Sequence, residues 1–149
     1  KAAGELGGGT FALTYADGVA DVDLGAALDF HHRSGRAATV TLVRPHSQWG
    51  VALLDEHDAV TGFVEKPRMD KWINGGFFFC EPSALSYLDE GSVLEREPLE
   101  RLAGDGELAG FRHEGFWDCM DTYKDAVLLN DLWFSGEAPW WIWKEAAVR

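Results

Sequence analysis

The chain has 149 residues, of which 46% are apolar, and its 25 acidic side chains outnumber its 13 basic ones, so the formal net charge is −12. This composition excludes a disordered chain, and no apolar run approaches the roughly 20 residues that a membrane-spanning helix needs. The negative charge argues against nucleic acid as a partner, because the nucleic-acid backbone is itself a polyanion. A chain this acidic that handled phosphates would need a divalent cation to reduce the repulsion.

The chain opens with KAAGELGGGT, which contains neither an initiating Met nor a leading strand, and we expect it to begin partway through a larger domain. The glycine cluster is similar to a phosphate-binding loop. It lacks a preceding strand, a following helix and a basic residue, so we interpret it as a turn or linker. Cys80 and Cys119 lack metal-ligand spacing and no secretory leader precedes them, which predicts reduced thiols in a cytoplasmic protein.

Apolar runs and helical patterns alternate along the rest of the chain. We expect strands at residues 10–15, 37–43, 50–55, 60–66, 73–80 and 107–113, the third and fourth of them forming a hairpin. We expect helices at residues 24–34, 82–90, 97–104 and 122–135. The first strand, helix and second strand suggest a right-handed parallel crossover. Together these patterns predict an α/β fold with a mixed sheet and helices around it.

Three aspartates, Asp17, Asp21 and Asp23, follow the first predicted strand. Ligands of open α/β sheets bind beyond the carboxyl ends of strands, so Asp17 is a candidate ligand for a metal or a substrate. Gly18 should allow a sharp turn of the backbone there. Asp21 or Asp23 should cap the helix that follows, which gives both a structural role.

Two later motifs allow a structural and a functional interpretation. In EKP, residues 65–67, an acid and a base on a surface strand would simply be solvated. Near a site, Lys66 could meet a phosphate, while Glu65 could accept hydrogen bonds from hydroxyl groups. In NGGF, residues 74–77, two glycines inside a strand mark the close approach of a ligand or of another backbone.

The segment GFWDCMDT, residues 115–122, supplies Asp118 and Asp121. Asp121 is predicted to be the N-cap of the last long helix, which is a sufficient structural reason for it. It could equally join Asp17 around one Mg²⁺, since such ions are held by one or two carboxylates plus substrate phosphates. From the residues alone both interpretations stay open.

The order of these motifs favours the functional interpretation. The stretches TYADGVADVD, GFVEKP, INGGFFF, FWDCMDT and LWFSGEAPWWIW resemble the glucose-1-phosphate cytidylyltransferase family of sugar-phosphate nucleotidyltransferases, from about Thr10 to Trp143. The Asp-Gly turn and EKP are shared across that superfamily. DGVAD, INGGFF, the FWDCMDT segment and the APW tail are more specific to the cytidylyl branch. The resemblance implies a Rossmann-like mixed sheet.

The resemblance also implies roles for individual residues. Asp17 and Asp121 would hold Mg²⁺, and Lys66 would contact the phosphate of glucose 1-phosphate. The sugar itself would be bound by Glu65 and Asn74 through its hydroxyls and by Gly50 through its backbone. The implied reaction is attack of a glucose 1-phosphate oxygen on the α-phosphorus of CTP, with pyrophosphate leaving. It needs no protein nucleophile, because positioning and metal charge lower the barrier.

Two departures from the family pattern matter. Ala16 stands where the family has Gly, and we expect it to crowd the turn slightly. The family's N-terminal glycine-rich loop with Thr-Arg, which holds the nucleotide, does not occur in this sequence. We therefore expect residues 1–149 to be a partial nucleotidyltransferase domain that is inactive alone. The alternatives are a uridylyl- or thymidylyltransferase acting on the same sugar phosphate, or a non-catalytic sugar-phosphate-binding module.

The C-terminal segment from about residue 122 is expected to be helical and then rich in tryptophan. Four of the seven tryptophans lie within eleven residues: Trp133, Trp140, Trp141 and Trp143. They could fold back over the chain's own core, with Pro139 helping the turn. Aromatic residues are enriched at the centres of subunit interfaces, however, and we expect this segment to form a homo-oligomer.

Overall fold

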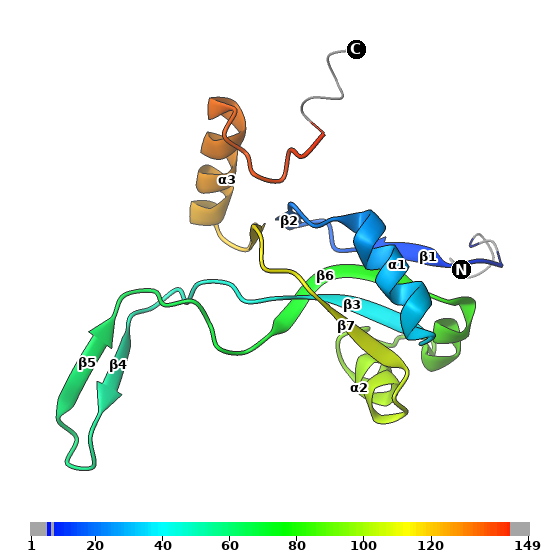
Figure 1. Ribbon diagram of the computed structural model, residues 1–149, viewed down its shortest axis with the longest axis horizontal. Helices are drawn as coiled ribbons and strands as arrows, with labels where there is room; N and C mark the ends of the chain where they lie inside the picture. Colours follow the sequence, from blue (N-terminus) through cyan, green and yellow to red (C-terminus); the bar gives the residue numbers. More distant parts are fainter. Residues whose placement is uncertain (1–5, 7, 144–149) are drawn as a thin grey trace.

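The computed structural model describes residues 6 and 8–143 (Figure 1). Most of the glycine-rich start, which we interpreted as a turn or linker, lies outside the described residues. The elements are β1 (Phe11–Thr14), β2 (Gly18–Ala20), α1 (Leu24–Ser34), β3 (Ala38–Val43), β4 (Val51–Leu54), β5 (Val60–Val64), β6 (Ile73–Cys80), η2 (Pro82–Tyr87), α2 (Glu97–Gly104), β7 (Leu108–Arg112), β8 (Trp117–Cys119) and α3 (Tyr123–Ser135).

The main sheet has four strands in the order β1-β6-β3-β7. Strand β6 is antiparallel to both of its neighbours, whereas β3 and β7 run parallel. Strands β1 and β3 therefore point the same way, as the strand–helix–strand pattern predicted, but β6 lies between them. The predicted α/β fold with a mixed sheet is confirmed.

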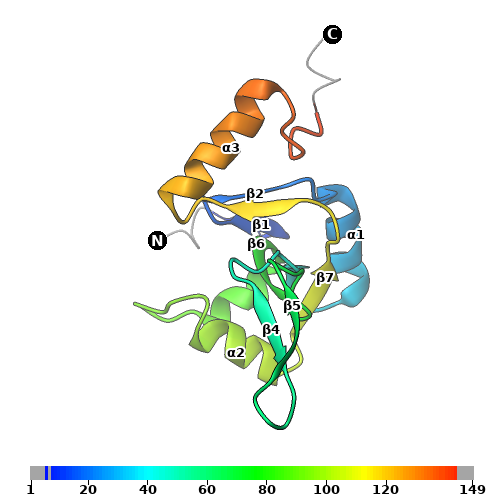
Figure 2. The same ribbon diagram turned by 90° about the vertical axis from the view of Figure 1, so that its left-hand side faces the viewer.

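Helices cover both faces of this sheet, because neighbouring residues of a strand point to opposite sides. On one face Ala38 packs in a buried cluster with Ala84 of η2 and Leu102 of α2. On the other face the hydroxyl of Thr39 lies 2.8 Å from Nδ1 of His31, a fully buried side chain of α1. Figure 2 shows α1 and α2 on opposite sides of the strands.

A polar network holds α1 on the sheet. The second ring nitrogen of His31 lies 3.2 Å from Glu81, just beyond β6. The hydroxyl of Thr10 donates to the same carboxylate at 2.6 Å, and this bond, with His31, lowers the pKa of Glu81. The buried imidazole is therefore paired at both nitrogens, which avoids the cost of an unsatisfied polar group.

The helix ends follow capping rules, with one correction to the prediction. Asp23 caps α1 by accepting a hydrogen bond from the amide of Ala26 at 2.9 Å, and Gly35 ends the helix with φ 62°. Helix α3 is capped by Thr122, so the prediction that Asp121 is its N-cap is wrong. Thr122 and Asp125 exchange hydrogen bonds in a capping box, which satisfies two helix-end groups at once.

The helix predicted at residues 82–90 is the short 3₁₀ segment η2 instead. Its hydrogen bonds run from residue i to i+3 and are poorly aligned, so such segments stay short. No helix in the described part of the chain is long and apolar enough to cross a membrane.

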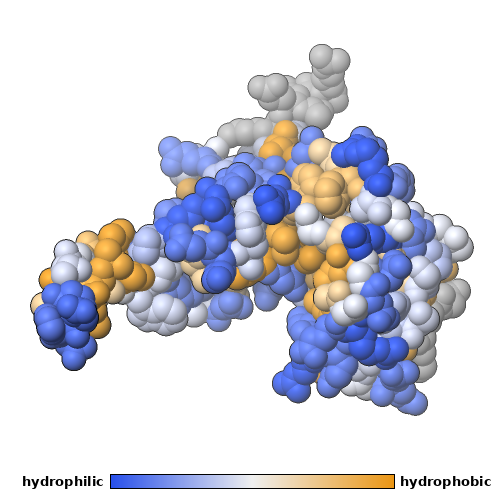
Figure 3. Space-filling view, turned by 60° about the horizontal axis from the view of Figure 1, so that its bottom comes forward, coloured by the Kyte–Doolittle hydropathy of each residue, from blue (hydrophilic) through white to orange (hydrophobic). Residues whose placement is uncertain are grey.

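Strands β4 and β5 form the predicted hairpin, which projects from the body of the molecule (Figure 1). Apolar side chains lie exposed along it, among them Leu53 and Phe63, the latter 66% exposed. Figure 3 shows this apolar surface on the projecting arm. An isolated two-stranded hairpin is only marginally stable in water.

The C-terminal segment folds back only in part. The ring of Trp141 packs on Trp133 of α3 at 5.0 Å, and Trp140 packs on Phe116 at 5.5 Å. The outer side of α3 remains open, with Phe134 80% exposed. The predicted fold-back is therefore confirmed for Trp140 and Trp141, whereas the interface stays a prediction.

Candidate functional site

A two-stranded ribbon brings together carboxylates from the two ends of the chain. Strand β2 pairs antiparallel with β8, with Gly18 opposite Cys119. The pairing extends beyond the strands, since the amide of Met120 donates to the carbonyl of Asp17 at 2.9 Å. Asp17 and Asp121 thus lie at the same end of the ribbon, and both side chains are exposed. Neither three-residue strand was predicted from the sequence.

The surroundings of the Cys119 thiol show that these acids lie near it. It donates to a carboxylate oxygen of Asp121 at 3.2 Å. Burial first, then the hydrogen bond to Asp121 and the charges of Asp121, Asp118 and Asp17, raise the pKa of Cys119 to about 12. Burial also raises the pKa of Asp118. Asp17, Asp118 and Asp121 therefore concentrate negative charge at the end of the ribbon, and we call these three residues the acidic patch.

This pair of acids fits a hard divalent cation. Within residues 6 and 8–143, no group of three or more His, Cys, Asp or Glu side chains forms a complete metal cage. Two carboxylates without further protein ligands suit Mg²⁺, which keeps several waters and takes the rest of its ligands from substrate phosphates. Because Thr122 caps α3, the carboxylate of Asp121 is not committed to the helix end.

Of Asp21 and Asp23, either of which was predicted to cap the first helix, only Asp23 does so. Asp23 caps α1, and a carboxylate oxygen of Asp21 lies 2.9 Å from Nε2 of His113. The turn does not use the conformational freedom predicted for Gly18, and the crowding expected at Ala16 stays a prediction. Neither Ala16 nor Gly18 adopts a positive φ, and a Cβ on Gly18 would meet only the indole of Trp117, at 3.9 Å. The turn therefore needs no glycine at position 18.

A second group of predicted residues lies at the base of the hairpin. The pairing of Val51 with Val64 places Gly50 opposite Glu65, and a Cβ on Gly50 would lie 2.8 Å from the Glu65 carboxylate. Lys66 follows with φ 46°, in the left-handed region, and it precedes a proline. Residues other than glycine rarely adopt this backbone conformation, and a following proline disfavours it further. Backbone strain of this kind is typical of functional sites.

Asn74 occupies a third position, at the start of β6. Its Nδ2 donates to the hydroxyl of Tyr15 at 3.0 Å, and its Oδ1 accepts the amide of Gly76 at 2.8 Å. Nδ2 carries two hydrogens, of which the bond to Tyr15 uses one. Burial and a hydrogen bond to Glu95 raise the pKa of Tyr15 to about 12, so its hydroxyl stays protonated. Asn74 is thereby oriented next to the turn that carries Asp17.

The two glycines after Asn74 allow close packing within the protein. A Cβ on Gly75 would lie 3.0 Å from the carbonyl oxygen of Thr41, and one on Gly76 would lie 2.5 Å from the ring of Tyr15. Gly76 also has φ 83°, which favours glycine. Of the two predicted reasons for these glycines, the close approach of another part of the chain is confirmed.

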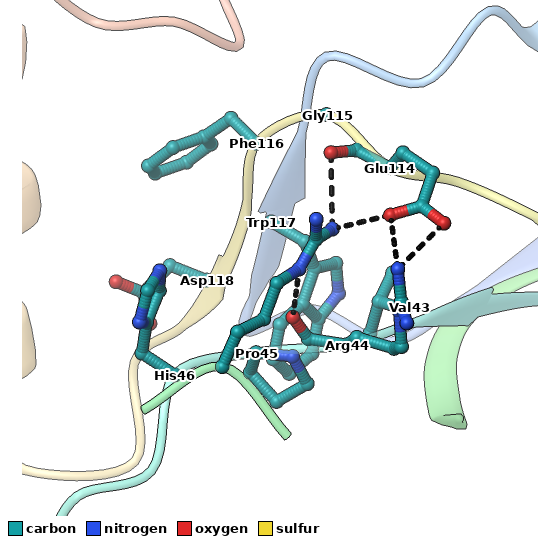
Figure 4. Close-up of a pocket in the computed structure, with 10 residues that line it drawn as sticks. Val43, Arg44, Pro45, His46, Glu114, Gly115, Phe116, Trp117 and Asp118 are labelled. Atoms are coloured by element: carbon teal, nitrogen blue, oxygen red, sulfur yellow. Dashed lines mark hydrogen bonds and ion pairs between the residues drawn. The ribbon is translucent and has the colours of Figure 1, made fainter. Parts of the chain in front are cut away.

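A cavity of about 410 Å³ lies beside the end of β3 and the start of β8 (Figure 4). Its charged and aromatic lining consists of Arg44, His46, Arg68, Glu114, Phe116, Trp117 and Asp118. Figure 4 shows Glu114 and Arg44 at one end and His46 and Asp118 at the other. His46 lies 3.0 Å from the carbonyl of Lys66, while Asp118 belongs to the ribbon. The cavity therefore borders both the hairpin base and the acidic patch.

Sequence reasoning did not find several residues of this region. Tyr15 carried a usable signal, because it directly precedes the Ala-Asp turn at a strand end. Arg44, Arg68 and Glu114 carried none, since they lie in three separate connecting segments and meet only in the folded chain.

A mixed sheet flanked by helices, with two exposed carboxylates beyond strand ends, defines an α/β protein. The chain belongs to the nucleotidyl transferase family, whose model matches residues 3–118. The fold agrees with this. The chain superposes on a Bacillus anthracis protein assigned as a glucose-1-phosphate thymidylyltransferase with a TM-score of 0.63, 17% identity and coverage of 88% of this chain and 57% of that one.

Sequence similarity to two relatives is higher. The chain is 46% identical over 136 residues to glucose-1-phosphate cytidylyltransferase of Salmonella typhi, which covers 90% of this chain and 52% of the relative. It is 44% identical over 140 residues to a Bacillus subtilis protein assigned the same activity, with coverage of 93% and 55%. The chain thus spans about half the length of the curated relatives it matches.

The surroundings of Cys119 predict slow chemistry at its thiol. With a pKa of about 12 against the ordinary 9.0, the thiolate fraction near neutral pH falls by about 10³-fold, and alkylation of Cys119 should slow accordingly. Asp121→Asn removes one negative charge and weakens the acceptor, so it should lower the pKa and speed alkylation. Iodoacetamide labelling across pH, resolved by mass spectrometry, measures this.

Cys80 is the internal control, because burial and Glu81 raise its pKa to about 11 without any contribution from Asp121. Its labelling rate should not change in Asp121→Asn. Equal labelling of Cys119 in wild-type and variant protein would contradict the described contact.

Proposed function

We propose that the protein to which this chain belongs transfers a cytidylyl group from CTP to α-D-glucose 1-phosphate, giving CDP-glucose and pyrophosphate. We further propose that residues 1–149 are part of its catalytic domain and supply the metal and sugar-phosphate groups. The nucleotide contacts would then come largely from residues outside this chain, which spans about half of its relatives. Two cysteines without metal-ligand spacing favour reduced thiols and therefore a cytoplasmic enzyme.

The pairing of β2 with β8 is the observation that carries this proposal. It brings Asp17 and Asp121 to the same end of the ribbon, beside the Cys119 thiol, where a cation would offset their negative charge. Both substrates carry phosphates, so a cation is also needed for them to approach this acidic patch. We propose Mg²⁺, held by Asp17 and Asp121. When bound, the ion supplies charge that offsets the negative charge on the reacting phosphates.

The chain's own residues act by binding and orientation. A phosphate oxygen of glucose 1-phosphate attacks the α-phosphorus of CTP, and the bond to the β-phosphate oxygen breaks as pyrophosphate leaves. Lys66 would hold the attacking phosphate as a point charge. Glu65 and Asn74 would bind glucose hydroxyls, and the backbone of Gly50 would contact the ring. Held in line, the two reactants need no protein nucleophile.

The choice of CTP rests on the relatives. The two similar sequences at 44–46% identity are assigned as cytidylyltransferases. The thymidylyltransferase in the fold comparison shares only 17% identity, which supports the fold and not the base. The first experiment distinguishes two alternatives. The protein could use UTP or dTTP in place of CTP, or it could bind the sugar phosphate without catalysis.

The first experiment uses the full-length protein with Mg²⁺, glucose 1-phosphate and CTP, UTP or dTTP, and follows pyrophosphate release and the nucleotide sugar formed. We expect CDP-glucose with CTP and much slower reaction with the others. Asp17→Asn or Asp121→Asn should lower turnover by at least about 10²-fold, because metal charge is worth several kcal/mol.

Asp29→Asn, which removes the charge of an acidic residue of α1, is the matched control and should leave turnover unchanged. Circular dichroism should show that all three variants stay folded. Wild-type turnover in Asp17→Asn would contradict the metal assignment, and faster reaction with UTP or dTTP would contradict the choice of base.

The second prediction concerns the sugar phosphate. Lys66→Ala should raise KM for glucose 1-phosphate by about 10- to 100-fold, because it removes a charged hydrogen bond to one substrate. KM for CTP should change little. Lys71→Ala, a nearby exposed lysine, is the control and should leave both constants unchanged. Equal effects of Lys66→Ala on both substrates would remove Lys66 from the sugar-phosphate subsite.

We also propose that the full-length protein is a homo-oligomer in which the C-terminal segment takes part. The support is the exposed aromatic surface around Phe134 and Trp133, next to tryptophans that the chain already covers itself. Patches of this kind on a folded protein are typical of contact surfaces.

Phe134→Ser should therefore shift the mass in solution towards the monomer, as measured by light scattering. Its cost in stability should be small because Phe134 is largely exposed. Trp140→Ser is the comparison: Trp140 packs on Phe116, so this change should lower the free energy of unfolding. An unchanged mass in Phe134→Ser would assign this surface to another role.

A further inference from the structure

Three connecting segments meet at one carboxylate, that of Glu114 in the loop between β7 and β8. Arg44, directly after β3, donates from Nη2 to both carboxylate oxygens at 2.9 Å. Arg68, two positions after Lys66, lies 2.8 Å from one of the same oxygens and donates to the Glu114 carbonyl at 3.1 Å. These contacts form one end of the cavity (Figure 4). We call these three residues the Glu114 cluster.

The cluster is continued by bonds that fix the backbone around Lys66. Nε of Arg68 donates to the carbonyl of Arg44 at 3.0 Å. The amide of Ser47 donates to the Pro67 carbonyl at 2.8 Å, and the amide of Met69 donates to the Pro45 carbonyl at 2.9 Å. The segment 66–69 is therefore fastened along its length to residues 44–47.

This fastening matters because the backbone at Lys66 is strained. A non-glycine residue with φ 46° costs about 1–2 kcal/mol, and such conformations persist only where the surroundings over-determine them. Without the contacts on either side, residues 66–68 would relax towards the extended conformation that a residue before proline prefers. The ammonium group of Lys66 would then leave its place.

The other end of the cluster leads to the acidic patch. Glu114 lies three positions before β8, whose far end carries Cys119 and leads to Asp121. Arg44 also stacks on Trp72 at 4.7 Å, two positions before Asn74 on the other chain segment. The Glu114 cluster thus contacts the chain segments that carry the proposed phosphate, sugar and metal ligands. It contacts none of those ligands itself.

The energetics separate this role from a purely structural one. The side chains of Arg44, Arg68 and Glu114 are 31%, 39% and 53% exposed, and ion pairs in such positions contribute little to global stability. The planar guanidinium of arginine donates in fixed directions, however, so these contacts set geometry more than they add energy. Loss of the cluster should therefore displace Lys66 without unfolding the protein.

We propose that Glu114, Arg44 and Arg68 are positioning residues that set Lys66 relative to the Asp17–Asp121 carboxylates. The inference rests on the proposed function, since it takes Lys66 to hold the sugar phosphate. It assigns no chemical step to the cluster. Its effect is to keep one substrate's phosphate in line with the metal site, where misplacement by about 1 Å can cost 10²-fold in rate.

The test compares full-length wild-type protein with Glu114→Gln, which keeps the shape and removes the charge, and with Arg68→Lys, which keeps the charge and loses the fork. Both should raise KM for glucose 1-phosphate by about tenfold or more and leave KM for CTP nearly unchanged. Asp89→Asn, which removes the acid from an exposed pair with Arg101, is the matched control and should change neither constant.

Hydrogen exchange gives a readout that does not depend on activity. The amides of Ser47 and Met69 should exchange faster in Glu114→Gln and Arg68→Lys, because their bonds to residues 67 and 45 join the two fastened segments. The amide of Ala26, bonded to the Asp23 cap, should not change. Thermal unfolding should show nearly unchanged stability.

Faster exchange together with a KM effect confined to glucose 1-phosphate supports the proposal. Unchanged exchange at Ser47 and Met69 overturns it, as does faster exchange with an unchanged KM for glucose 1-phosphate. If Arg68→Lys behaves like wild type, the charge alone suffices and the positioning role is wrong. A wild-type protein without cytidylyltransferase activity would contradict the proposed function instead, and the exchange result would then decide whether the cluster holds segment 66–69.

Discussion

The close packing at Gly75 and Gly76 is the constraint on which the rest of this site depends. Strand β6 passes so near to Thr41 and to the ring of Tyr15 that a Cβ at either glycine would collide with them. The same stretch accepts a hydrogen bond from the indole of Trp117 at its Gly75 carbonyl, 2.8 Å away. The ribbon of β2 and β8 is thereby attached to the main sheet.

The consequences of that packing reach each part of the site. Asn74 precedes the glycines and is oriented by Tyr15, which in turn directly precedes the turn with Asp17. Trp117 begins β8, which leads to Asp121. Bulkier residues in β6 would push Tyr15 and Trp117 outward, and with them the strand ends that carry Asp17 and Asp121. The absence of side chains at Gly75 and Gly76 thus sets the separation of the larger functional side chains.

Charge is divided unevenly over this chain, and the division explains the chemistry we propose. Three acids gather at the end of the ribbon, where their combined field and burial hold the Cys119 thiol protonated. On the other side of the cavity, two arginines share one glutamate, and the hydrogen bond from Arg44 lowers the pKa of Glu114. A cation at the first place and a phosphate beside Lys66 would complement this arrangement in a chain of net charge −12.

The sequence by itself determined the elements whose causes are local. The strands β1, β3 and β6, the hairpin, and α1 with its Gly35 end followed from periodicity and capping, which act between residues a few positions apart. The sequence left Asp21 and Asp23 both open as the cap of α1. Motif order added the family and the candidate residues.

Tertiary structure decided what depends on distant partners. Three-residue strands such as β2 and β8 carry no readable pattern and exist because they pair with each other. The cap of α3 is a local feature that the sequence analysis assigned wrongly: Thr122 caps instead of Asp121 because Asp125, three positions on, can return the bond, whereas Lys124 could not accept one. The Glu114 cluster joins residues 70 and 46 positions apart, and only the folded sheet brings their charges within reach.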